Sequence, residues 1–153
     1  MTPDPGSSFF GRVFTAQGEP AELPLDRLAG LCPDDDVLVW IDLLDPSEEI
    51  LEHVWAASDL PSEALKFARE GTMPEVAQRG AYFWVRCIVV DDAREDANAK
   101  DKLQGSLLVC VAGPNRVITL RRKPVAFLDA MHHAQHGHAA IGALSAESFV
   151  ATL

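Results

Sequence analysis

The sequence predicts a single α/β domain, residues 1–153, in which helices cover both faces of a mixed β-sheet. Apolar segments with helical spacing alternate with segments rich in aromatic and β-branched residues, as in α/β proteins. Residues 37–41 are continuously apolar, which is typical of a strand covered on both faces. Residues 107–111 and 117–120 are strands joined by a short turn, so they must be antiparallel and a purely parallel sheet is excluded.

The first elements are short strands and one helical turn. Residues 9–14 and 21–23 are apolar segments on either side of a turn containing glycine and proline, and we expect two strands there. Residues 24–31 fit a short helical turn. The buried strand at 37–41 follows directly.

Two helices are expected next. Asp45 can cap the first, Pro46 fits its first position, and Glu48 lies three residues beyond the cap. The second is expected from Ser62 to Glu70, ending at a glycine.

The second half of the chain adds strands before it returns to helices. Residues 81–90 form a strand rich in aromatic and β-branched side chains, and the polar segment 91–102 fits an exposed connection. Residues 113–116 contain the Pro-Asn pair of a tight turn and complete the hairpin. A helix is expected from Pro124, and another begins near Ser145.

The end of the chain carries its own expectation. The helix capped by Ser145 has run barely two turns at Leu153, and so short a helix is marginal in water. We therefore expect the chain to be truncated after Leu153 and the native protein to continue.

Composition excludes several classes. The net charge of −10 argues against a nucleic-acid partner, which requires a basic face. No stretch reaches the roughly 18–20 apolar residues of a membrane helix, and the N-terminus lacks the pattern of a signal peptide. A soluble fragment made in the cytosol is expected, and its three separated cysteines fit free thiols.

Catalysis is not expected. The chain has no nucleophile elbow, phosphate loop, dinucleotide fingerprint or His-Glu-x-x-His motif. Two carboxylates can still meet in space without a sequence signature, so a small hydrolase with a dispersed site remains an alternative.

Five short segments, in a fixed order, carry a resemblance to a known family. A strand-to-helix entry lies at 39–46, and a helix break at a proline lies at Leu60-Pro61. A second proline segment follows at 73–76, an aromatic strand at 82–88 and a strand ending in arginine at 115–121. From residue 37 onward the chain resembles the soluble N-terminal domain of the CorA-type divalent metal-ion transporters. The Arg86-Cys87-Ile88 end of the aromatic strand is similar to the zinc-transporting, ZntB-like branch.

The resemblance implies a transporter that assembles as a pentamer, with this domain on the cytoplasmic face of the inner (plasma) membrane. This chain would be its cytoplasmic funnel and regulatory domain, with a CorA-like α/β/α fold. Its partners would be its own stalk and transmembrane helices, which these 153 residues do not include, and further copies of itself. The transported ion would be a divalent cation, zinc being favoured over magnesium or cobalt, and no small-molecule substrate is expected.

Two positions depart from the family pattern. Leu65-Lys66 replaces an acidic pair that contributes to a metal-sensing interface in magnesium transporters, and a lysine cannot ligate magnesium. Glu75 replaces a basic residue of the proline segment, and the sequence gives no reason for this exchange.

Histidines give the candidate metal site. His132 and His136 are four residues apart and His133 and His136 three, so either pair can face one ion on a helix. Neutral imidazole suits zinc or cobalt better than magnesium. The alternative is that these imidazoles lie exposed at a helix end without binding metal. A free-standing metal-binding or adaptor domain, with no transport role, is the alternative function.

Overall fold

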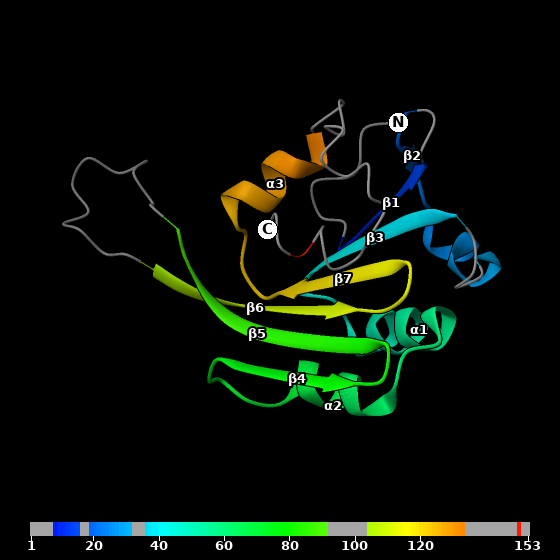
Figure 1. The fold of residues 1–153 in the computed structure, drawn as a ribbon. Helices are drawn as coiled ribbons and strands as arrows, with labels where there is room; N and C mark the ends of the chain where they lie inside the picture. The colour runs from blue at the N-terminus through cyan, green and yellow to red at the C-terminus, as the bar shows by residue number, and fades with distance from the viewer. Residues whose placement is uncertain (1–7, 16–18, 32–35, 92–103, 134–149, 151–153) are drawn as a thin grey trace.

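A computed structural model describes residues 8–15, 19–31, 36–91, 104–133 and 150 of the chain. Within these, seven strands form one mixed sheet with helices on both faces, which confirms the predicted fold class (Figure 1). The strands are β1 (Phe9–Thr15), β2 (Ala21–Glu22), β3 (Val37–Leu44), β4 (Glu75–Arg79), β5 (Tyr82–Asp91), β6 (Gln104–Ala112) and β7 (Arg116–Arg121). The helices are the 3₁₀ helix η1 (Leu25–Gly30) and the α-helices α1 (Glu48–Ser58), α2 (Ser62–Arg69) and α3 (Ala126–His133).

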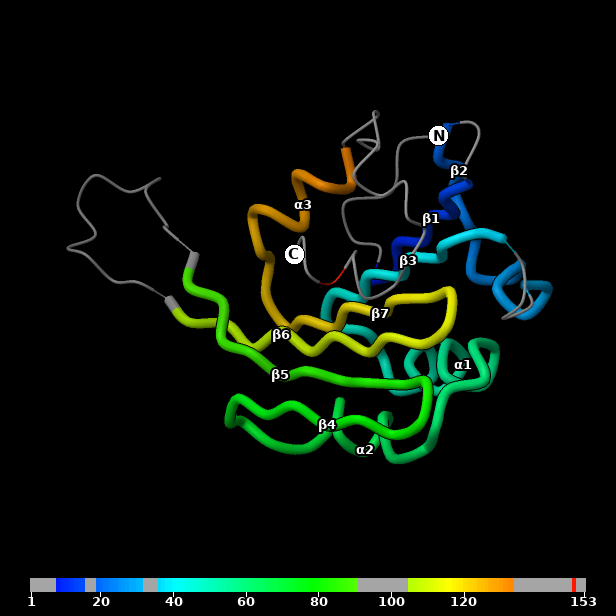
Figure 2. The backbone as a smooth tube through the Cα atoms, viewed as in Figure 1, coloured from blue at the N-terminus to red at the C-terminus, as the bar shows by residue number. Residues whose placement is uncertain are grey.

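The strand order is β2-β1-β3-β7-β6-β5-β4. Strands β3 and β7 run parallel, with Trp40 opposite Val117, and every other described pair is antiparallel. Figure 2 shows the backbone leaving β3 for α1 and α2 and returning to β7 through the β4–β5–β6 meander. The predicted hairpin is confirmed, and Gly113 donates its N–H to the Arg116 carbonyl at 2.9 Å.

Strand β3 divides the core between the two faces of the sheet. Val39, Ile41 and Leu43 pack on one face with η1, α1 and α2. Leu38 and Trp40 point to the other face, where α3 covers them. The continuous apolar run at residues 37–41 is therefore explained as expected, because β3 is buried on both faces.

The predicted start of the first helix is wrong. The N-cap is Ser47, whose Oγ accepts the Ile50 N–H at 3.3 Å, and the helix begins at Glu48. Asp45 instead has a φ of +43° and donates its backbone N–H to the Arg121 carbonyl at 2.8 Å. The β3–β7 pairing thus extends to Asp45 and keeps it out of the cap position.

Strand β4 is not predicted by the sequence pattern. It begins within the proline segment and pairs with β5 through a two-residue turn, in which Gly80 has a φ of +59°. The second helix ends at Arg69, one residue before the predicted Glu70. The connection at 92–102 and nearly all of the last expected helix lie outside the described residues.

Candidate functional site

A buried group of charged side chains lies on the α3 face of the sheet, where β3 and β7 run side by side. Asp42 of β3 and Arg121 of β7 each have side chains that are 1% exposed. Arg121 donates to Asp42 Oδ2 from Nη2 at 2.7 Å and from Nε at 3.2 Å. Thr119 donates its hydroxyl to Asp42 Oδ1 at 2.6 Å, so both carboxylate oxygens accept hydrogen bonds.

Helix α3 adds two titratable side chains to this group. His132 Nε2 lies 2.7 Å from Asp42 Oδ2, and a carboxylate can only accept, so Nε2 carries the proton. Asp129 Oδ1 accepts from Arg121 Nη2 at 2.7 Å. Arg121 also donates to the Val125 carbonyl at 3.4 Å. We call this group of five side chains the polar centre. Its members are Asp42, Thr119, Arg121, Asp129 and His132.

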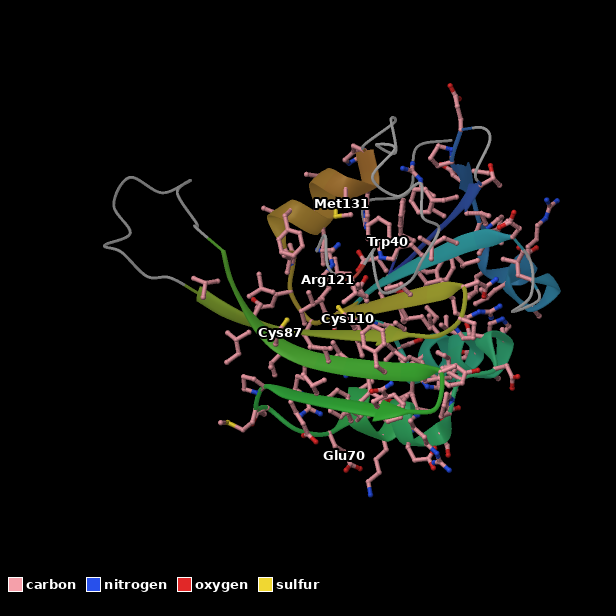
Figure 3. The ribbon with its side chains drawn as sticks, viewed as in Figure 1. Trp40, Glu70, Cys87, Cys110, Arg121 and Met131 are labelled. Atoms are coloured by element: carbon pink, nitrogen blue, oxygen red, sulfur yellow. The ribbon has the colours of Figure 1, made fainter. Side chains whose placement is uncertain are left out.

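Aromatic rings enclose the imidazole. His132 stacks on Phe10 with ring centroids 3.8 Å apart and planes 9° from parallel, and the centroid of the Trp40 ring is 5.4 Å away. Trp40 Nε1 donates to Thr119 Oγ1 at 3.1 Å. Figure 3 shows Trp40 and Arg121 lying beneath α3, on which Met131 is labelled. The His132 side chain is 19% exposed, so this packing holds α3 against the sheet.

The electrostatics keep Asp42 ionised. Burial alone raises the pKa of a carboxyl group, because it disfavours the charged form. Hydrogen bonds from His132, Arg121 and Thr119 outweigh burial, and the pKa of Asp42 lies below its ordinary value. A buried carboxylate thus neutralises the buried guanidinium of Arg121 and binds α3 through His132.

The arrangement suits helix docking better than catalysis. The Thr119 hydroxyl donates to the carboxylate rather than to the imidazole, so it lacks the base contact of an activated nucleophile. Among the described residues, no three His, Cys, Asp or Glu side chains are grouped to hold a metal ion. The contacts of Asp129 and His132 with the strand residues fix where α3 lies on the sheet.

The structure describes two of the three predicted metal ligands. His132 Nε2 faces Asp42, whereas the neighbouring His133 is exposed. His136 lies outside the described residues. The metal site at His132, His133 and His136 thus stays a prediction.

A second buried cation lies on the opposite face of the sheet. Arg86 of β5 donates from Nη2 to the Phe67 carbonyl at 2.6 Å and also to the Glu70 carbonyl. Its Nη1 donates to the Met73 carbonyl at 3.1 Å and lies 3.5 Å from the carboxylate of Glu75, the acidic residue in the proline segment. Arg86 thus satisfies the carbonyl groups at the end of α2.

The sequence patterns do not mark the strand residues of the polar centre as site residues. Asp42 is the acidic residue inside the apolar strand β3, and Thr119 and Arg121 are two residues apart on one face of β7. A polar residue within a strand buried on both sides requires a buried polar partner, and Asp42 in its apolar strand is the signal in the sequence for such a pair. The departure at Leu65-Lys66 lies on α2, where Leu65 is half-buried and Lys66 is exposed.

The comparisons with known proteins concern the fold. Neither family models nor curated protein sequences match the chain. The structure of full-length CmaX is similar over 96% of this chain and 45% of its own, with a TM-score of 0.69 and 20% identity. The soluble domain of the CorA magnesium transporter of Methanocaldococcus jannaschii aligns over 81% of this chain and 45% of its own, with a TM-score of 0.60 and 14% identity.

The cytoplasmic domain of ZntB from Vibrio parahaemolyticus aligns over 86% of this chain and 51% of its own, with a TM-score of 0.59 and 10% identity. The chain thus spans about half, or less, of the structures it resembles. None of the described helices is long and apolar enough to cross a membrane. The chain has the fold of the soluble domains of CorA-type transporters, as the resemblance predicted.

Proposed function

We propose that this chain is the cytoplasmic regulatory domain of a divalent-cation transporter, attached in the whole protein to stalk and transmembrane helices. The observation that carries the proposal is the fold, which matches CmaX over 96% of the chain and the soluble domains of CorA and ZntB over most of it. The net charge of −10 supports it, because an acidic surface raises the local concentration of cations.

The finer features of this proposal come from the family resemblance. The transported cation is zinc in preference to magnesium or cobalt, and five copies form the transporter, with this domain at the cytoplasmic face of the inner membrane. We assign no catalytic role to the polar centre.

Regulation in this proposal acts through α3. Its histidines take part in cation binding, and occupancy shifts the packing of the domain and biases the pore through the stalk. Because His132 Nε2 faces Asp42, a cation held through that atom competes with the contact that docks α3. Cation binding and α3 docking are then coupled, and each weakens the other.

The whole function is tested with the native full-length protein in liposomes that contain a fluorescent zinc indicator. We expect the protein to accelerate zinc influx. In matched assays, magnesium and cobalt should enter more slowly. No accelerated flux of any of the three ions would refute the transporter and favour the metal-binding or adaptor domain.

The local part is tested by calorimetric titration of this chain with zinc. The double variant His132→Ala/His136→Ala should bind more weakly than wild type, whereas the exposed His53→Ala on α1 should behave as wild type. If wild type and the double variant bind zinc identically, the histidine site is refuted while the transporter proposal stands.

A further inference from the structure

Strand β4 leaves one edge of the sheet open. It is the last strand in the sheet order and pairs with β5 on one side only, among the residues that the structure describes. Figure 1 shows it at the lower margin of the sheet, with α2 beneath one face. An edge strand offers unpaired N–H and C=O groups to any strand that can lie beside it.

The register of the β4–β5 hairpin identifies the open backbone groups. A two-residue turn is flanked by a hydrogen-bonded pair, and such pairs then alternate with non-hydrogen-bonded ones. Arg79 ends β4 at this turn, so it and every second residue before it bond to β5. Val76 and Gln78 consequently direct their N–H and C=O groups away from the sheet.

The sequence of β4 is complementary to itself. If a second β4 lies antiparallel with Ala77 opposite Ala77, Val76 faces Gln78 and their outward groups form hydrogen-bonded pairs. Glu75 then lies opposite Arg79 in both symmetric positions. These are non-hydrogen-bonded positions, where side chains approach most closely, and opposite charges there are stabilising.

The exposed apolar surface also fits this arrangement. Val76 is 71% exposed and lies opposite Val85 of β5. In the paired arrangement the two copies of Val76 become diagonal neighbours on one face, within reach of each other. We propose that β4 is an interface for a second copy of this chain, which continues the sheet across a two-fold axis.

The charged residues of β4 do not prevent this pairing. Glu75 lies 3.5 Å from Arg86, and Arg79 contacts Glu63 of α2. Arg79 and Glu63 are 64% and 51% exposed, so exchanging this pair for one with the second copy costs little. Glu75 is 59% exposed, and buried Arg86 keeps its three carbonyl acceptors when Glu75 turns toward the second copy. Pro74 precedes the strand and lacks an N–H, which confines the pairing to β4 itself.

This interface is independent of the proposed transport function. A two-fold contact uses the same surface on both copies, so it cannot close a ring of five. In a pentamer it would connect a domain of one ring to a domain of another.

Sedimentation of the full 153-residue chain over a concentration series tests the inference with two charge variants. Glu75→Arg places arginines opposite each other, and Arg79→Glu places glutamates opposite each other. Each alone should raise the dimer dissociation constant about tenfold or more. An equimolar mixture of the two restores both opposite-charge pairs and should associate as wild type does.

Glu49→Arg on α1 is the matched control, because it makes the same charge change at an exposed position away from β4 and should leave association unchanged. Thermal unfolding of each variant separates lost association from lost folding. The inference is overturned if wild type stays monomeric at several hundred micromolar. It is equally overturned if neither charge variant changes the dimer dissociation constant, or if an equimolar mixture of the two does not restore association.

Cross-linking provides a second test that does not depend on charge. Ala77→Cys places two thiols at a non-hydrogen-bonded pair across the axis, where Cα atoms about 4.5 Å apart permit a disulfide. Mild oxidation should link Ala77→Cys into dimers, whereas wild type, with its three native cysteines, should remain largely unlinked. Equal linking of the two proteins contradicts the proposed register.

Discussion

Replacing Asp42 by asparagine should destabilise the domain strongly, because it removes the carboxylate from a fully buried ion pair. Oδ2 accepts three contacts of 3.2 Å or less, two from Arg121 and one from His132, and Oδ1 accepts one at 2.6 Å. The amide of asparagine keeps one acceptor and turns N–H groups toward donors. Losing one member of a buried pair costs about 3–5 kcal/mol.

The lower end of that range applies here. Arg121 keeps its contacts to the Asp129 carboxylate and the Val125 carbonyl, so the buried guanidinium still has a counter-ion. We expect a loss of about 3 kcal/mol. For a chain of this length the loss lowers the melting temperature by about 9 °C.

The assay is urea unfolding at pH 7, followed by tryptophan fluorescence, with Asp45→Asn as the control. Asp45 is 70% exposed and 3.4 Å from exposed Arg122, and its positive φ is one that asparagine tolerates. The control should therefore change stability by less than about 1 kcal/mol. Equal effects of the two substitutions would refute the assignment of Asp42 as the central residue of the polar centre.

The sign of the pH dependence provides a further check. Since the folded pKa of Asp42 is lowered, its stabilisation is complete above the unfolded pKa of about 3.9 and is lost as pH falls through the folded pKa. The difference between wild type and Asp42→Asn should therefore shrink below about pH 4. A difference that stays constant to pH 2 contradicts this explanation.

Three further predictions concern single positions. Gly71→Ala should cost about 2 kcal/mol or more in urea unfolding, because φ is +98° and the added Cβ would lie 2.5 Å from Arg86 Nη1; an unchanged midpoint contradicts this. Arg86→Lys should speed amide exchange near the end of α2, because one ammonium cannot replace the guanidinium at three carbonyl groups; exchange as slow as in wild type argues against the cap. Cys110 should resist alkylation at pH 8 in the native protein, since burial raises its pKa to about 12; rapid labelling, located by peptide mass spectrometry, would show that the thiol is accessible.

The strands that are buried on both faces could be predicted from the sequence, whereas the edge and the polar centre could not. Strand β3 is visible as an apolar run because α1 and α3 cover its two sides. Strand β4, Glu-Val-Ala-Gln-Arg, has one β-branched residue and is held mainly by its hydrogen bonds to β5. No local pattern reveals such a strand.

The polar centre depends on contacts over long sequence distances. Asp42 meets Arg121 and His132, which lie 79 and 90 residues further along the chain. The sequence shows the charges but not which of them meet. The histidine spacing relates His132 only to its neighbours along the helix, and it gives no indication of the contact with Asp42.

The contact between β3 and β7, which is the one parallel pair among the described strands, has a consequence for folding kinetics. On one side of it, β1 pairs antiparallel with both β2 and β3, and on the other side β4 to β7 form a meander. Each half can form from local contacts, whereas joining them closes a long loop and is entropically slow. Asp42 and Thr119 meet at this junction, so Asp42→Asn should speed unfolding more than it slows folding. Stopped-flow rates that show mainly slower folding would instead place the junction in the folding nucleus, and the two halves would then form together.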